Sequence, residues 1–287
     1  MTGGCTLFTA LKIFVILILC MCLFPICLLQ ELSGNVKHFC ALTSLKVDNS
    51  NVEGIFCLNE INEQQMNLGL EFIYLDVLPM MTCLFVGPKN SFSLQNLTRL
   101  KIKRCEKLEI VFSTSIIRCL PQLFTLRIEE CKELKHIIED DLENKKSSNF
   151  MSTKTCFPQL NTVVVAKCNK LKYVFPVSIW KELSELKALM IREADELEEI
   201  FVSEGDDKVN IPNLKVVVFV NLPSLCHAKG IQFQAVKHHF VQNCRNLSVA
   251  STLTEGFRYD RGYGTHFKNY YMLAENNYIS CCKLTKD

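Results

Sequence analysis

The chain has 287 residues, of which 48% are hydrophobic and 22% charged, and its formal net charge is +2. This composition supplies enough apolar material for a sizeable core and excludes global disorder. The near-neutral charge gives no general electrostatic argument for nucleic acid or for an acidic partner. The 16 cysteines are scattered without C-x2-C pairs at zinc-site spacing, and a chain this large and aliphatic does not need a disulfide framework.

Residues 13–29, "IFVILILCMCLFPICLL", form an uncharged run near the N-terminus. The run is long for the apolar core of a signal peptide and slightly short for a membrane-spanning helix. Three interpretations remain open: an uncleaved signal-anchor, a cleaved signal, or an artefact of a wrongly predicted gene start. We therefore treat residues 1–34 as a separate hydrophobic segment.

The rest of the chain repeats one template, L-x-x-L-x-[IV]-x-x-C-x-x-L, usually followed by an apolar pair such as "VF" or "IF". Strong copies begin at Leu97, Leu123, Leu160 and Leu186, and weaker copies at Leu42, Leu70, Leu214 and Val236. Successive starts lie 22 to 28 residues apart, except for one spacing of 37 that contains a polar stretch. These spacings are typical of leucine-rich repeats.

Each copy contains an x-L-x-I-x segment, whose alternation predicts a short strand with one buried face. A single repeat cannot bury that face alone, so neighbouring repeats must stack. The fold we predict is an α/β repeat solenoid, a leucine-rich repeat horseshoe with short parallel strands on the concave face and short helices or irregular turns on the convex face. About eight repeats occupy residues 35–252, with a loop insertion near 139–156. Residues 253–287 form either a cap or an extension from an altered reading frame.

The cysteine of the template recurs at the point where the chain leaves each strand. A small buried side chain with a weak donor suits that corner, where many leucine-rich repeats use asparagine. We predict a structural ladder rather than a metal site or a chain of disulfides. Its members are Cys105, Cys131, Cys168 and Cys244.

The template, the following "VF" or "IF", and links such as "FPQL", "IPNL" and "NLPSL" resemble a known family. Over residues 38 to 250 the chain is similar to the C-terminal leucine-rich repeat region of plant disease-resistance proteins. The closest resemblance is to the coiled-coil nucleotide-binding class of immune receptors (NLRs). The resemblance implies a solenoid that senses a pathogen effector or a host target, and that restrains a nucleotide-binding switch domain.

The chain departs from that family because no G-x-x-x-x-G-K-[ST] phosphate loop and no N-terminal coiled coil occurs in the sequence. Without the loop nothing cradles a nucleotide phosphate, so we expect no cofactor. The resemblance therefore implies a truncated receptor, a fragment or a decoy-like paralogue that keeps a protein-recognition surface.

The predicted partner-binding surface is the outward row of the concave strands. The positions flanking the last apolar residue of each strand are Lys101, Lys103, Arg127, Glu129, Val164, Ala166, Met190, Arg192, Val218, Val220, Phe240 and Gln242. The row is charged at first and apolar from residue 164 to residue 220, which suggests a protein interface. Three interpretations stay open for the apolar part: a partner binds it, the tail after residue 252 covers it, or the register is misplaced.

No catalytic or metal-binding constellation emerges from the sequence. His238 and His239 are adjacent rather than four residues apart, and no carboxylates flank them. We therefore expect no enzyme, no metal and no nucleic-acid partner, with membrane contact only through residues 13–29.

An alternative is a secreted or membrane-anchored leucine-rich repeat protein, which the hydrophobic segment and the sequons at Asn96 and Asn246 would suit. However, none of the eight copies carries the Gly-x-Ile-Pro continuation of extracellular plant repeats, and unpaired cysteines suit a reducing compartment. We expect a cytoplasmic protein. The substrate arm of a ubiquitin ligase would need an F-box, which is not found.

Overall fold

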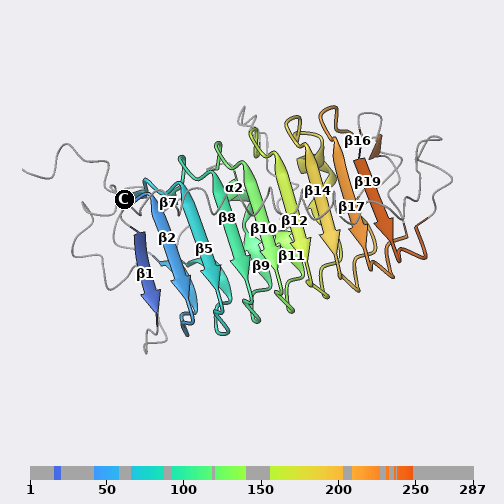
Figure 1. Cartoon of the computed structure of the whole chain (residues 1–287). Helices are drawn as coiled ribbons and strands as arrows, with labels where there is room; N and C mark the ends of the chain where they lie inside the picture. The colour runs from blue at the N-terminus through green and yellow to red at the C-terminus, as the bar shows by residue number, and fades with distance from the viewer. Residues whose placement is uncertain are drawn as a thin grey trace, which may run out of the picture. The chain divides into compact units, whose positions relative to one another are not determined.

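The computed structural model describes residues 16–20, 42–57, 66–86, 92–117, 120–139, 156–202, 209–226, 231–232, 236 and 238–247. Nine parallel strands form one sheet in chain order (Figure 1). They are β1 (Ile16–Cys20), β2 (Ser44–Asp48), β5 (Phe72–Asp76), β8 (Arg99–Lys103), β10 (Thr125–Glu129), β12 (Thr162–Ala166), β14 (Ala188–Arg192), β17 (Val216–Val220) and β19 (His238–Gln242). Each of the eight predicted repeats supplies one strand from β2 to β19, which confirms the solenoid.

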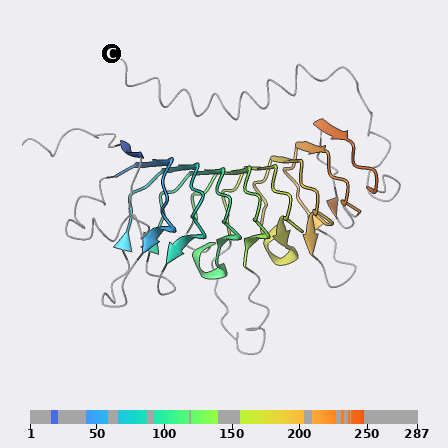
Figure 2. The same cartoon turned by 90° about the horizontal axis from the view of Figure 1, so that it is seen from below.

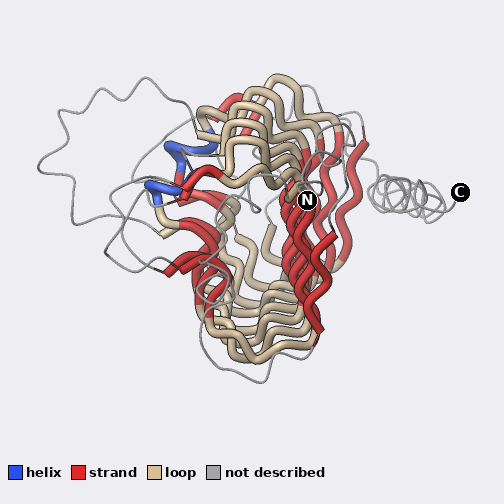
Figure 3. The backbone as a smooth tube through the Cα atoms, turned by 90° about the vertical axis from the view of Figure 1, so that its left-hand side faces the viewer, coloured by secondary structure: helices blue, strands red, loops and turns tan. Residues whose placement is uncertain are grey.

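The return side of the solenoid carries short strands that pair two by two (Figures 2 and 3). The pairs are β3 (Gly54–Cys57) with β6 (Cys83–Val86), β4 (Met66–Asn67) with β7 (Phe92–Ser93), β9 (Ile110–Phe112) with β11 (His136–Ile138), β13 (Phe175–Pro176) with β15 (Phe201–Val202), and β16 (Val209–Asn210) with β18 (Ile231–Gln232). Two helices, α2 (Thr114–Ile117) and α3 (Val177–Trp180), lie on the same side.

The two short helices agree with the predicted fold of this side, and the strand pairs are a further feature that the sequence analysis did not predict. Some of these strands, such as β3 and β9, contain the "IF" or "VF" pair of the sequence, because β-branched and aromatic residues favour extended pairing. The two helices have four residues each and persist only through packing, since isolated helices this short are unstable.

The core lies between the nine-stranded sheet and the return side. The second and fourth residues of each strand from β2 to β17 point inward and are buried, as with Leu100 and Ile102 of β8. The first leucines of the copies from Leu42 to Leu214 and the leucine after the cysteine are buried beside them, as with Leu97 and Leu108. Burying each such side chain stabilises the fold by roughly 1.5–3 kcal/mol, and most of this burial requires a neighbouring repeat.

Each strand of the nine-stranded sheet from β2 onward is followed by a residue in the left-handed region, with φ between 52° and 57°. These corner residues are Asn49, Val77, Arg104, Glu130, Lys167, Glu193, Asn221 and Asn243. From Asn49 to Asn221, the N–H of each corner residue donates to the carbonyl of the last strand residue in the next repeat, over 2.8 to 3.2 Å. The unusual backbone angle thus extends the hydrogen-bond ladder of the sheet by one residue, which stabilises the corner.

The cysteine ladder lies next to this corner. Cys105, Cys131 and Cys168 are fully buried, and each thiol lies 3.4 to 3.5 Å from the carbonyl oxygen two residues earlier. Contact with the Cys131 thiol and burial together raise the pKa of Cys105 and Cys168. Cys244 makes the same contact at 3.5 Å but is half-buried. Cys105, Cys131 and Cys168 therefore occupy equivalent buried corners of successive repeats.

An aromatic chain packs the return side across three repeats. Ring centroids lie 5.9 Å apart between Phe112 and Phe157, 6.1 Å between Phe157 and Phe175, and 5.5 Å between Phe175 and Trp180. Trp180 is fully buried at the end of this aromatic chain. Tilted rings at these separations are favourable beyond their buried area.

The hydrophobic N-terminal segment contributes a strand. β1 pairs with β2 in parallel, with Leu17 opposite Leu45 and Leu19 opposite Val47. In the same register the template places Phe14 at its first leucine and Cys22 at its cysteine. The sheet therefore begins inside residues 1–34, which sequence analysis had separated from the repeats. Among the described residues, no helix is both long and apolar enough to span a membrane.

Candidate functional site

The outward residues of the nine-stranded sheet form three columns, which we call the concave face. In-register pairing places Lys46, Tyr74, Lys101, Arg127, Val164, Met190, Val218 and Phe240 in its middle column. Asp48, Asp76, Lys103, Glu129, Ala166, Arg192, Val220 and Gln242 form the third column. The predicted row is thus correctly aligned, which removes a misplaced register as an explanation of its apolar part.

The apolar part of the face is closed to solvent. Val164, Met190 and Val218 are 1%, 3% and 2% exposed, so the expectation of an exposed patch is wrong at these three residues. Arg192, Val220 and Phe240 remain half-buried. Residues 253–287, which the sequence suggested as a cover, lie outside the described residues.

Arg127 and Glu129 form a buried ion pair on β10. The Arg127 guanidinium donates to the Glu129 carboxylate at 2.7 Å, and both side chains are at least nine-tenths buried. Both residues were expected to offer charges to a partner. They are instead shielded from solvent, and each compensates the other's charge.

The open part of the face lies on β2, β5 and β8, and Tyr74 is at its centre. The ammonium groups of Lys46 and Lys101 lie 5.5 Å and 5.2 Å from the centroid of the Tyr74 ring. In the first column, the Arg99 guanidinium lies 5.1 Å from the centroid of the Phe72 ring. Cations near aromatic rings at these distances are attracted electrostatically. All five residues are half-buried, so aromatic rings position these cations at a partly accessible surface.

Asp76 joins the middle column to the edge of the sheet. The Tyr74 hydroxyl donates to Asp76 at 2.5 Å, and Arg104 donates to both carboxylate oxygens at 2.7 and 2.6 Å. Burial alone would raise the pKa of Asp76, but the hydrogen bonds from Arg104 and Tyr74 outweigh it and lower that pKa. The carboxylate is therefore ionised and compensated, and it fixes the Tyr74 ring between its two lysines.

Sequence reasoning began its row at Lys101 and missed Lys46, Phe72 and Tyr74. The signal was present, because the copies at Leu42 and Leu70 place these residues at outward positions of the same template. These residues contact each other across neighbouring repeats. Such contacts can be recognised in the sequence only when the weaker copies are aligned in register with the strong ones.

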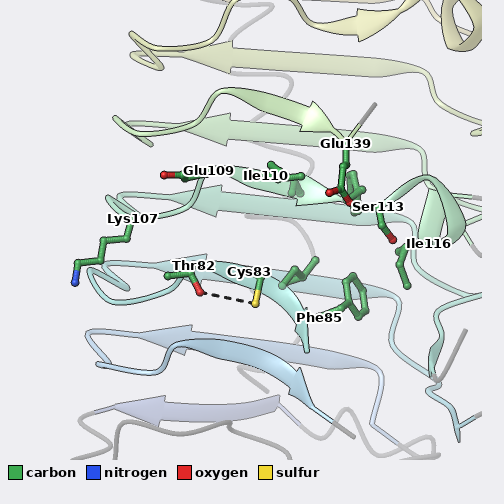
Figure 4. A pocket seen from close by; sticks show the side chains of 12 residues that line it. Thr82, Cys83, Phe85, Lys107, Glu109, Ile110, Ser113, Ile116 and Glu139 are labelled. Atoms are coloured by element: carbon green, nitrogen blue, oxygen red, sulfur yellow. Dashed lines mark hydrogen bonds between the residues drawn. The ribbon is translucent and has the colours of Figure 1, made fainter. Parts of the chain in front are cut away.

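A second feature is a hollow of about 370 Å³ between β6 and β9 on the return side (Figure 4). These two strands each pair with another neighbour, so the ladder is interrupted between them. Cys83 and Phe85 line one side and Ile110 the other, with Lys107 toward one end. The lining of the hollow combines apolar side chains such as Phe85 and Ile110 with charged ones such as Lys107 and Glu139.

The hollow offers no activated nucleophile. The Cys83 thiol contacts the Thr82 hydroxyl at 3.9 Å, and burial raises the pKa of that thiol. A protonated thiol without an adjacent base is a poor nucleophile. Within the described part of the chain, no group of three or more His, Cys, Asp or Glu side chains is arranged to hold a metal ion.

Comparison with known families gives one finding that agrees with this architecture. The model of the leucine-rich repeats of RPS2-like plant disease resistance proteins matches residues 20–132 and 130–253. No curated protein and no solved structure matches the chain. The match covers most of the chain, includes all strands from β2 to β19, and begins at the last residue of β1. The chain therefore belongs to the RPS2-like leucine-rich repeat family of plant disease resistance proteins.

Proposed function

We propose that this protein recognises another protein in plant defence through the concave face of its solenoid. One observation carries the proposal: the chemistry of the middle column changes from repeat to repeat while the inward positions beside it stay apolar. The column runs from Lys46 through Tyr74 and Lys101 to Val164 and Phe240, whereas the inward residues from β2 to β17 are all aliphatic except Phe219.

This separation between apolar inward residues and variable outward residues suits the recognition of a partner. The inward residues fix the backbone, so an outward residue can vary without changing the fold. The half-buried residues Lys46, Tyr74 and Lys101 lie side by side in register on neighbouring strands. This open surface fits a protein better than a small molecule, since small ligands need a deep concave pocket. The hollow between β6 and β9 is the competing site, but its lining offers no catalytic pair.

The partner we propose is the nucleotide-binding switch domain of an RPS2-like resistance protein, with a pathogen effector or a host target as alternatives. The resemblance to nucleotide-binding resistance proteins implies such a switch beside the repeats that this chain matches. We further propose that the chain acts as a truncated receptor. Full-length transcripts test this point: transcripts that continue upstream in frame into a phosphate loop would show that the solenoid is one part of a complete receptor.

We propose a cytoplasmic location on the basis of the thiols. The described residues include seven free cysteines, of which Cys105, Cys131 and Cys168 are adjacent rungs of one ladder. Free thiols in such number suit a reducing compartment. A glycosidase treatment of the plant-expressed protein checks this, because a mobility shift caused by glycans at Asn96 or Asn246 would place the chain in the secretory pathway.

The experiment that tests recognition is co-expression in leaves with the coiled-coil and nucleotide-binding portion of an RPS2-like protein, with ion leakage as the measure of cell death. Three forms are compared at equal protein level: the wild type, the concave variant Tyr74→Ala with Lys101→Glu, and Lys132→Glu. Lys132 is an exposed residue in the turn after β10, where it pairs with Glu106 of the preceding repeat.

We expect the wild type and Lys132→Glu to change ion leakage to the same extent, and the concave variant to lose the effect. Equal behaviour of the two variants, whether both active or both inactive, would argue against recognition through the concave face.

A further inference from the structure

We propose that the hollow between β6 and β9 is a docking site separate from the concave face. It receives an extended protein segment that carries a large apolar side chain and, beside it, a basic residue. The inference goes beyond the proposed function, because the hollow lies on the return side and not on the nine-stranded sheet (Figure 4).

The hollow exists because strand pairing is interrupted at this point of the return side. β6 pairs with β3 and β9 pairs with β11, so β6 and β9 belong to separate sheets although they lie in successive repeats. A space of about 370 Å³ remains between them. This volume is at the lower end of the range for ligand sites, so it suits one large side chain with its flanking backbone.

The walls of the hollow are apolar and incompletely covered. Cys83, Phe85 and Ile110 line it and are only half-buried. The Phe56 ring supports the Phe85 ring from one side, with ring centroids 5.1 Å apart. An apolar side chain that enters the hollow removes this surface from water, which is favourable. Because aromatic residues dominate binding energy at protein interfaces, tryptophan is the most suitable anchor.

The charges at the rim select the residue beside this anchor. Glu109 pairs with Lys135 at 2.9 Å, whereas neither Glu139 nor Lys107 forms an ion pair within the described part of the chain. Glu139 and Lys107 lie toward opposite ends of the hollow (Figure 4). A basic residue of the partner can therefore pair with Glu139, while Lys107 repels a basic residue at the other end.

The open shape of the hollow favours a protein segment over a free small molecule. Thr82, Lys107 and Glu139 are exposed at the rim, so a small ligand would keep much of its surface in water, whereas sites for small ligands bury most of it. The residues that flank the anchor in a protein segment can contact this rim. The carboxylates of Glu109 and Glu139 also disfavour a nucleic acid, since they repel phosphates.

The test uses the Cys83 thiol, which lines the hollow, to report occupancy. The full-length protein is treated with iodoacetamide in the presence of synthetic peptides. Mass spectrometry then gives the alkylation rates of Cys83 and of Cys226, a half-buried thiol outside the hollow. Fluorescence anisotropy of the same peptides, labelled at one end, gives their dissociation constants.

Three peptides of equal length serve as probes. The first is a glycine-serine chain with a tryptophan and, two positions later, an arginine, which an extended backbone places on the same face. The second has alanine in place of the tryptophan, and the third has glutamate in place of the arginine.

Three variants are compared with the wild type. Glu139→Lys reverses the charge at one end of the hollow. Ile110→Trp fills the hollow from β9, and slow alkylation of the buried Cys131 checks that this variant folds. Glu198→Lys is the matched control, because Glu198 is exposed between β14 and β15, outside the hollow, and the substitution changes the net charge by the same amount.

We expect the first peptide to slow the alkylation of Cys83 and to leave that of Cys226 unchanged. Loss of the tryptophan should weaken binding by about tenfold or more. The glutamate peptide should bind the wild type about fivefold more weakly than the arginine peptide, since an exposed ion pair contributes little, and Glu139→Lys should reverse this preference. Ile110→Trp should abolish the protection of Cys83, and Glu198→Lys should leave the affinities unchanged.

The inference is overturned if the first peptide fails to protect Cys83, if the arginine and glutamate peptides bind the wild type alike, or if Glu198→Lys acts like Glu139→Lys. Tyr74→Ala changes the concave face and not the hollow, so it should leave peptide binding unchanged. The leaf response therefore tests the proposed function, and protection of Cys83 tests the hollow independently of it.

Discussion

The side-chain amide of Asn243 donates to the amide oxygen of Asn221 at 2.8 Å, and both residues occupy the same left-handed corner in successive repeats. Asparagine adopts this backbone conformation more readily than most residues. The same left-handed backbone conformation recurs at this corner in every repeat, and some residue types adopt it more easily than others. Substitutions at the corner should therefore change the free energy of unfolding.

Val77 occupies that corner after β5 with φ at 53°. A β-branched residue is strained there, at a cost of roughly 1–2 kcal/mol. We expect Val77→Asn to raise the free energy of unfolding by about 1 kcal/mol, because the N–H of residue 77 still donates to Lys103. The midpoint of urea unfolding measures the change. The reverse substitution, Asn221→Val, should destabilise by a similar amount, and a loss of stability in Val77→Asn would contradict this account of the corner.

The buried ion pair of Arg127 and Glu129 should respond differently from the exposed pairs between repeats. Removing one member leaves a buried charge, so Glu129→Ala should cost about 3–5 kcal/mol of unfolding free energy. Lys132→Gln, which breaks the exposed pair with Glu106, should change that free energy by less than about 1 kcal/mol. Chemical denaturation of the two variants side by side measures both values. Similar losses would mean that the burial of the first pair has no energetic consequence.

The stability of the chain should depend on pH through Asp76. Its pKa is lowered in the folded state, so its ionised form contributes stability above the unfolded value of about 3.8. That contribution is lost as the pH falls through the lower, folded pKa. We expect Asp76→Asn to be less stable than the wild type at pH 6 and the difference to shrink as the pH falls below about 3.8. Urea unfolding across this range measures the difference, and a constant gap would show that Asp76 does not titrate as described.

The ladder thiols should resist alkylation in the native protein. Cys105, Cys131 and Cys168 are fully buried, whereas Cys226 is half-buried. At pH 8 we expect iodoacetamide to modify the three ladder cysteines at least about tenfold more slowly than Cys226. Mass spectrometry of the digested protein gives the four rates. In concentrated urea the rates should become alike, and equal rates in the native protein would mean that the ladder opens readily.

Much of the fold can be predicted from the sequence because two patterns indicate the strand of each repeat. One is the period-2 alternation of apolar and polar residues, and the other is the fixed spacing between copies of the template. The inward residues Leu126 and Ile128 are buried as their pattern requires. The pattern is hidden at β1, where residues 16–20 are apolar at every position and the alternation cannot be seen. It is also weak on the return side, since a pair such as Val111 and Phe112 is too short to show a period.

The candidate site could be predicted only in part. Alignment of the repeats places Lys101 and Met190 in one column, as the structure confirms. The alignment cannot show that Met190 is buried while Lys101 is half-buried. The solvent accessibility of each side chain depends on the size of its neighbours and on what lies above it. It also cannot show that Asp76 is held by Arg104 and Tyr74, which requires side-chain geometry.

The most direct test of recognition by the concave face is calorimetric titration of the full-length protein with the nucleotide-binding domain of an RPS2-like protein. Wild type, Lys101→Glu and Lys132→Glu are measured under the same conditions. The account predicts saturable binding by the wild type, a dissociation constant about tenfold or more weaker for Lys101→Glu, and an unchanged constant for Lys132→Glu. Absence of binding by the wild type, or the same constant for both variants, would contradict it.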